Sequence, residues 1–175
     1  MRLILAAEGR TFFRLPSPTS VSQLQLYTDG SSRGNPGPGG YGAILIWGSV
    51  RKELSGAFRT TTNNRMELLA VITGLEALTR EGINVTVYSD SKYVVDSVTK
   101  GWVFGWVKKG FAGKKNADLW QRYLRVHSKH NIKFVWVKGH ADNPLNNRCD
   151  QLATEAADRG PWAVDSGFES SQLLS

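Results

Sequence analysis

The spacing of apolar side chains divides the chain into segments with a period of two and segments with a helical period. Apolar and polar residues alternate from Gln23 and Leu24 onward, which is typical of a half-buried strand. Short runs rich in β-branched and aromatic residues recur further along the chain. Together these runs predict five strands, at residues 24–29, 41–47, 52–58, 85–90 and 132–137. Helical spacing predicts helices at residues 64–80, 91–98, 102–106, 119–130 and 144–160.

The order of these segments indicates an α/β fold. The first three strands follow one another with short connections, which favours an antiparallel meander. Helices separate the later strands, which favours parallel neighbours joined by right-handed crossovers. We therefore expect a mixed five-stranded sheet, with three antiparallel strands plus parallel strands and helices on both faces. This domain would span residues 23–160, between a poorly ordered N-terminal tail at 1–22 and a C-terminal tail at 161–175.

The glycine-rich segment Gly37–Gly42 matches the pattern G-x-G-x-x-G. In a dinucleotide-binding domain, this pattern opens a helix. Here it opens a β-branched and aromatic run, so we interpret it as a tight glycine turn.

The chain is basic, with a formal net charge of +7 and a pI of about 9.7, which favours an anionic partner. Ten basic residues and one acidic residue lie between Lys100 and Lys138, so this basic strip alone exceeds the net charge of the whole chain. A solvated face is the simpler explanation for a charge run. Aromatic residues between the lysines favour nucleic acid instead. These aromatic residues are Trp102, Phe104, Trp106, Phe111 and Trp120.

Composition also bears on the compartment. The only cysteine, Cys149, excludes an internal disulfide and suits a reducing compartment. The apolar runs are too short to span a membrane. We expect a monomeric cytoplasmic protein, with organellar targeting by the basic residues of 1–22 as the alternative.

Four acidic residues are candidates for a metal site. Asp29 and Asp90 stand at the predicted ends of strands, and Glu67 and Asp150 stand on predicted helices. Carboxylates that gather within a few ångströms repel one another unless a cation lies between them. Mg²⁺ suits such oxygen ligands best, and Mn²⁺ can substitute chemically. Taken alone, Glu67 is explained equally well as an acid in the first turns of a helix.

His140 lies on the loop that follows the last predicted strand. It has no partner at metal-ligand spacing, so we interpret it as a proton-transfer residue. An ordinary exposed loop histidine is the alternative.

Several motifs in this order closely resemble the type 1 ribonuclease H family in its bacterial form. The resemblance covers residues 24–158. The matching segments are Tyr27–Ser31, Gly34–Ala43, Thr61–Leu68, Ser89–Val94, Asn116–Trp120, Trp136–His140 and Asn147–Ala153.

The resemblance implies a function and a set of site residues. It implies an endonuclease that hydrolyses the RNA strand of RNA–DNA hybrids by two-metal-ion catalysis, leaving 5′-phosphate and 3′-hydroxyl ends. It places two Mg²⁺ ions on the four acids and gives His140 a role in proton transfer or product release. It also assigns substrate contacts to Asn35, Thr62, Asn63, Asn64, Trp102, Lys108 and Lys109. The basic loop at residues 112–117 is shorter than in familiar members.

Two other functions are weighed against this one. One is a related metal-dependent nuclease, either a 3′–5′ exonuclease or an integrase. The exonuclease pattern has a second acid two residues after the first, where this chain has Ser31. A non-catalytic nucleic-acid-binding module would gain nothing from four acids near an anionic ligand.

Overall fold

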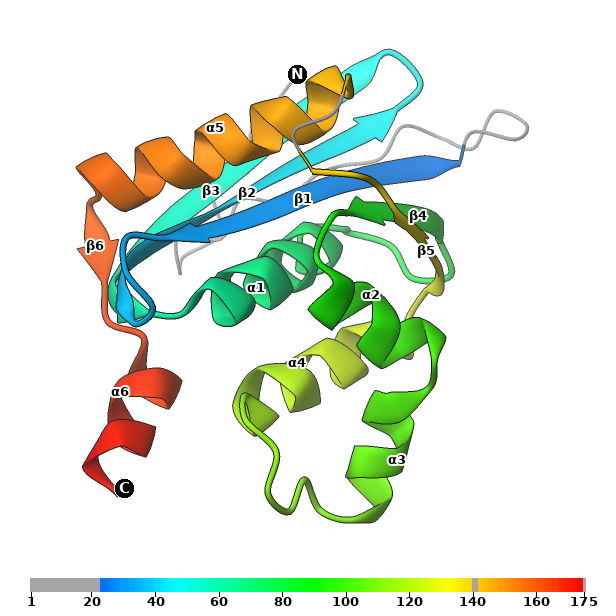
Figure 1. Ribbon diagram of the computed structural model, residues 1–175. Helices are drawn as coiled ribbons and strands as arrows, with labels where there is room; N and C mark the ends of the chain where they lie inside the picture. Colours follow the sequence, from blue (N-terminus) through cyan, green and yellow to red (C-terminus); the bar gives the residue numbers. More distant parts are fainter. Residues whose placement is uncertain (1–22, 140–141, 175) are drawn as a thin grey trace.

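A single mixed sheet forms the centre of the computed structural model, which describes residues 23–139 and 142–174 (Figure 1). Its strand order is β5-β4-β1-β2-β3-β6. The strands are β1 (Leu24–Ser32), β2 (Gly37–Trp47), β3 (Val50–Thr61), β4 (Asn84–Ser89), β5 (Asn131–Trp136) and β6 (Trp162–Ala163).

The strand pairing confirms the mixed sheet. β1 lies at its centre, antiparallel to β2 and parallel to β4, and β5 adds parallel to the outer side of β4. The expected count of five strands is wrong, because β6 pairs in parallel with the free edge of β3. A strand of two residues is too short to show any period, which is why the apolar pattern does not reveal it.

Helices cover both faces of the sheet, as expected. α5 lies along one face, and α1 lies against the other, with α4 packed outside it (Figure 1). The described helices are α1 (Asn63–Glu76), α2 (Lys92–Thr99), α3 (Trp102–Lys108), α4 (Ala117–His127), α5 (Pro144–Arg159) and α6 (Ser166–Leu173). Among the described residues, no helix has the length and apolar character needed to cross a membrane.

The core lies mainly between the sheet and α1. Leu68, Val71, Ile72 and Leu75 of α1 are fully buried, and Trp120 of α4 closes this core from outside. α1 is apolar on almost every side because it is enclosed by the sheet and α4 together.

The expectation of a glycine turn at Gly37–Gly42 is wrong, because these residues begin β2. Their lack of a side chain serves helix packing instead. A β-carbon on Gly40 would lie 2.5 Å from the Ala153 carbonyl oxygen, and one on Gly42 would lie 2.4 Å from that of Cys149. The glycines therefore let α5 lie directly on the sheet.

The C-terminal segment 161–175, expected as a tail, contains β6 and α6. An ion-pair network around the buried side chains of Arg65 and Asp165 anchors it. The guanidinium of Arg65 donates to both Asp165 and Asp118, and the Thr61 hydroxyl donates to Asp165 at 2.6 Å. α4 begins at Ala117, two residues before the predicted start, and Asp118 lies in its first turn. The predictions for residues 1–22 and for His140 concern positions outside the described residues.

Candidate active site

Asp29 lies within β1 and not at its end, contrary to the sequence prediction. The parallel pairing of β1 with β4 stops at Thr28, whereas its pairing with β2 continues past Asp29 to Ser32. Asp29 thus marks the point where β4 leaves β1. Its side chain is buried, and one carboxylate oxygen accepts a 2.8 Å hydrogen bond from the Gly30 N–H.

Glu67 reaches the same place from α1. A β-carbon on Gly30 would lie 2.3 Å from the Glu67 backbone nitrogen, so α1 can approach β1 only because residue 30 is glycine. The helix is fixed at its start by Thr62, whose hydroxyl accepts from the Arg65 N–H. Glu67 is consequently buried between helix and sheet.

Asp90 completes the cluster from the residue that follows β4. One carboxylate oxygen from each of Asp29, Glu67 and Asp90 lies within 4.8 Å of the other two. Asp150 on α5 is not a member of this group of three. We call Asp29, Glu67 and Asp90 the acid cluster.

The acid cluster is electrostatically strained. Burial, followed by the charge of Asp90, raises the pKa of Asp29 to about 7, and Asp150 adds to this shift. Burial, followed by the charges of Asp29 and Asp90, raises the pKa of Glu67 well above its ordinary value. Both shifts mean that the folded protein resists holding these carboxylates charged together.

A divalent cation suits this arrangement. Glu67 Oε2 is buried and has no hydrogen-bond partner among the described residues. Such an orphaned acceptor is costly unless a cation or a proton satisfies it. The donors are all carboxylate oxygens, which are the ligands that hard divalent ions prefer. The residues present therefore fit a metal ion of the magnesium class.

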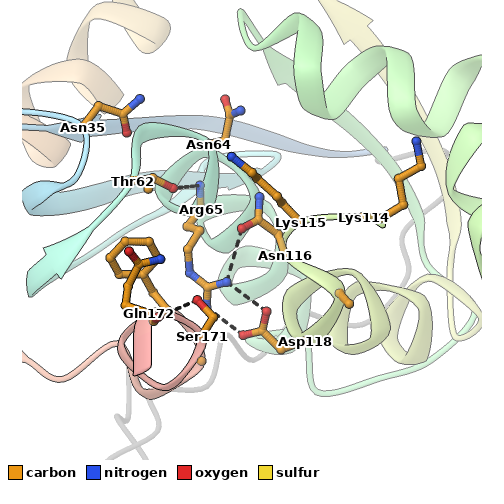
Figure 2. A pocket seen from close by; sticks show the side chains of 13 residues that line it. Asn35, Thr62, Asn64, Arg65, Lys114, Lys115, Asn116, Asp118, Ser171 and Gln172 are labelled. Carbon is orange, nitrogen blue, oxygen red and sulfur yellow. Dashed lines mark hydrogen bonds and ion pairs between the residues drawn. The ribbon is translucent and has the colours of Figure 1, made fainter. Parts of the chain in front are cut away.

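Three of the predicted substrate-binding residues, Asn35, Thr62 and Asn64, line a groove of about 530 Å³, whereas Asn63 is not among the residues that line it (Figure 2). Asn35, Thr62 and Asn64 form one side of it, and Lys115 approaches from the loop before α4. The Asn35 side-chain oxygen accepts from the Asn63 N–H at 3.1 Å. This bond ties the loop after β1 to the start of α1.

The α6 side of this groove was not predicted from the sequence. Ser171 and Gln172 of α6 line the groove opposite Asn64, and Arg65 with Asp118 forms part of its wall (Figure 2). Asp165 could have indicated that this segment packs against the domain, because a buried arginine such as Arg65 needs carboxylate partners. The sequence does not indicate which acids those are.

The basic strip is divided between two surfaces. Lys114 and Lys115 line the groove described above, and Lys108 and Lys109 lie exposed at the end of α3. Arg122, Arg125 and Lys129 instead line a separate groove of about 420 Å³ at the C-terminal end of α1. The residues of the basic strip therefore do not all face the same groove.

Trp102, the predicted aromatic contact, begins α3 and is 46% exposed. The Lys100 ammonium lies 5.1 Å from the centre of its ring. An exposed ring beside a cation provides both stacking and charge for a nucleic-acid strand.

Gly30→Ala should disturb the fold and the site together. The new methyl group would meet the backbone of α1, so we expect a loss of about 1–3 kcal/mol in unfolding free energy. Displacement of Glu67 should also slow turnover roughly a hundredfold if the cluster is catalytic. Gly105→Ala is the control, because nothing lies within 4 Å of that site on α3. Denaturant unfolding and turnover measure both effects, and equal behaviour of the two variants would contradict the close approach.

Comparison with known proteins gives a consistent result. The family model described as RNase H matches residues 21–158. Ribonuclease H of Syntrophus aciditrophicus is 53% identical over 153 residues, covering 83% of this chain and 87% of that protein. The solved structure of LC9, a type 1 ribonuclease H with the type 2 active-site motif, is 32% identical with a TM-score of 0.71. That match covers 89% of this chain and 82% of the other. The LC11 enzyme, solved in complex with an RNA/DNA hybrid, is 26% identical with a TM-score of 0.57, covering 78% and 98% of the two chains.

Proposed function

Because the chain belongs to the RNase H family, we propose that it hydrolyses the RNA strand of RNA–DNA hybrids internally. Cleavage would leave 5′-phosphate and 3′-hydroxyl ends. The observation that carries the proposal is the acid cluster, where three carboxylates meet within 4.8 Å. A groove lined by amide and basic side chains opens at the start of α1, the helix that carries Glu67, and such side chains suit an anionic backbone.

The cofactor in this proposal is Mg²⁺, two ions per site during catalysis, with Mn²⁺ as a chemical substitute. Asp29, Glu67 and Asp90 would hold the metal, with Asp150 contributing from α5. When bound, the ions would supply positive charge that activates a water molecule and stabilises the departing 3′-oxygen. The protein's part is to hold the carboxylates in place before the substrate arrives, and the burial of Asp29 and Glu67 accomplishes this.

The groove residues would orient the hybrid. Asn35 already accepts a hydrogen bond through its side-chain oxygen, so its amide N–H groups remain to donate to the substrate. The Thr62 hydroxyl accepts from the Arg65 N–H, so its own hydrogen can be directed to a phosphate oxygen. Asn63 and Asn64 would contact the wide minor groove of the hybrid, where the 2′-hydroxyl groups are displayed.

A substrate panel tests the proposal. We expect cleavage of the RNA strand in an RNA–DNA hybrid, and none of DNA duplex. A hybrid with both RNA ends blocked should be cut as well, because the proposed enzyme is an endonuclease. Binding without cleavage would favour the nucleic-acid-binding module, and dependence on a free 3′ end would favour the exonuclease.

The proposal includes a monomer in the cytoplasm. Cys149 is a buried free thiol, which suits a reducing compartment.

The lysines near the groove should set affinity and not chemistry. Replacing Lys108, Lys109, Lys114 and Lys115 together by Ala should raise the Michaelis constant and flatten its salt dependence, with turnover at saturating hybrid close to wild type. Each lysine that no longer neutralises a phosphate should reduce the slope of log affinity against log salt by about one. Initial rates against hybrid concentration at several salt concentrations measure this slope.

The matched control removes charge from the other basic surface. Arg125 and Lys129 line the groove at the far end of α1, so replacing both by Ala should leave the salt slope unchanged. A slope that falls by the same amount per charge removed in both sets would show that only the total charge matters.

A further inference from the structure

Trp136 is a partly exposed aromatic residue whose side chain bonds to the backbone of Asp90, a member of the acid cluster. It ends β5, an edge strand of the sheet, and 46% of its surface is exposed. Its indole Nε1 donates a hydrogen bond of 3.0 Å to the backbone carbonyl oxygen of Asp90. Nearly half of this large aromatic side chain is therefore exposed to solvent, while its only polar atom bonds to the backbone of Asp90.

The segment that follows Trp136 surrounds Asp90 on its other sides. The Val137 N–H donates to the Ser89 carbonyl at 3.0 Å, which extends the contact of β5 with β4 beyond the strand. Gly139 then lies against the carboxylate, since a β-carbon there would be 2.5 Å from Asp90 Oδ2. The end of β5 therefore fixes both the backbone and one side of the carboxylate of Asp90.

Asp90 needs such restraint more than its two partners do. Asp29 lies within a paired strand and Glu67 on a buried helix, whereas Asp90 lies in the connection between β4 and α2. One carboxylate oxygen of Asp90 lies within 4.8 Å of an oxygen of each partner, so repulsion between like charges favours its outward movement. A connection of this kind can yield to that repulsion unless its backbone is held.

We propose that Trp136 is a positioning residue for Asp90, whose indole N–H holds the carboxylate in the acid cluster ready for a metal ion. The inference rests on the proposed role of Asp90 as a metal ligand. The Lys92 ammonium lies 5.3 Å from the centre of the Trp136 ring, on the first residue of α2. This contact joins α2 to the end of β5 and keeps the indole over the connection that it holds.

The chain contains a matched control for this bond. Trp162 of β6 is 48% exposed, and its indole Nε1 donates to the Ala157 carbonyl at 2.9 Å. The bond has the same chemistry and nearly the same exposure, but it joins β6 to the end of α5 and touches no member of the acid cluster.

The test compares Trp136→Phe with Trp162→Phe. Each substitution keeps an aromatic ring and removes the N–H donor, and thermal unfolding in EDTA checks that both variants fold. Calorimetric titration with Mg²⁺, repeated with Mn²⁺, should show metal affinity weakened roughly ten- to a hundred-fold by Trp136→Phe, the scale on which groups that orient a metal ligand affect affinity. The Mg²⁺ concentration for half-maximal turnover should rise by the same factor. Excess Mg²⁺ should restore most of the turnover, while the Michaelis constant for the hybrid stays unchanged.

Trp162→Phe should alter none of these quantities.

The variant Asp90→Asn distinguishes a failure of the positioning role from a failure of the proposed metal site. If Asp90→Asn loses metal binding and Trp136→Phe binds metal as Trp162→Phe does, the positioning role is overturned and the proposed function stands. If Asp90→Asn binds metal like wild type, the assignment of Asp90 fails, and the inference fails with it. A turnover defect in Trp136→Phe that excess Mg²⁺ does not relieve would also overturn the inference.

Discussion

Asp29→Asn should abolish hybrid cleavage while leaving hybrid binding intact. The substitution keeps the shape of the side chain but removes a negative charge from the centre of the acid cluster. Metal charge contributes several kcal/mol to such reactions, so turnover should fall roughly a thousandfold or more. The groove and the basic loop are untouched, and the loss of a negative charge should if anything favour an anionic ligand. Turnover and hybrid affinity at fixed salt measure the two effects separately.

The same variant should be more stable than wild type when no divalent ion is present. The pKa of Asp29 is raised from its ordinary value of 3.8 to about 7 in the folded protein. Between these values the folded state binds more protons than the unfolded state, so wild-type stability falls as pH rises from about 4 to about 7. Asn does not titrate, so the variant escapes this loss. We expect an advantage of roughly 1–3 kcal/mol at pH 7 and above, which vanishes near pH 4.

A control keeps this interpretation specific to the cluster. Asp96 forms a surface ion pair with Lys100, so Asp96→Asn makes the same chemical change away from the cluster. It should neither abolish turnover nor stabilise the protein. If Asp29→Asn behaved like Asp96→Asn in both respects, the acid cluster would not be the catalytic centre.

His140→Ala should slow turnover by roughly ten- to ten-thousand-fold, the range expected for one general acid–base group. One reason is that the preceding residue, Gly139, lies close to the Asp90 carboxylate, so residue 140 follows directly after a contact with the acid cluster. A histidine has an ordinary pKa near 6.5, so it can both take and release a proton at neutral pH. The Michaelis constant for the hybrid should change little. Turnover against pH, for wild type and variant, measures the effect.

His130→Ala is the control for this prediction. His130 lies in the groove at the far end of α1, beside Lys129, and burial lowers its pKa. Its replacement should leave turnover at the wild-type level. If His140→Ala matched His130→Ala, residue 140 would be an ordinary loop histidine.

Local patterns in the sequence predicted the elements that carry the site. Alternation from Leu24 and the buried run around Val85 predicted β1 and β4, and the helix that precedes β4 favoured their parallel pairing. Three of the four predicted acids come together because those strands diverge after Thr28, beside the buried face of α1. The motif resemblance singled out Glu67, whose helical pattern alone indicated only a helix-dipole acid.

The features that the sequence did not reveal depend on contacts between distant segments. β6 is two residues long, and α6 is held through the bonds of Asp165 with Arg65, 100 positions apart. The glycines of β2 resemble turn residues locally, and only the approach of α5 explains them. The position of Asp29 inside β1 likewise depends on β2, which continues to pair after β4 has ended.

The most direct test of the account is the metal dependence of cleavage on a hybrid with uniformly labelled RNA. Protein treated with EDTA should leave the RNA strand intact, and added Mg²⁺ should restore internal cleavage. The products should carry 5′-phosphate and 3′-hydroxyl ends, with the DNA strand unchanged. Cleavage that persists in EDTA, or a hybrid that is bound but never cut at any Mg²⁺ concentration, would contradict the account.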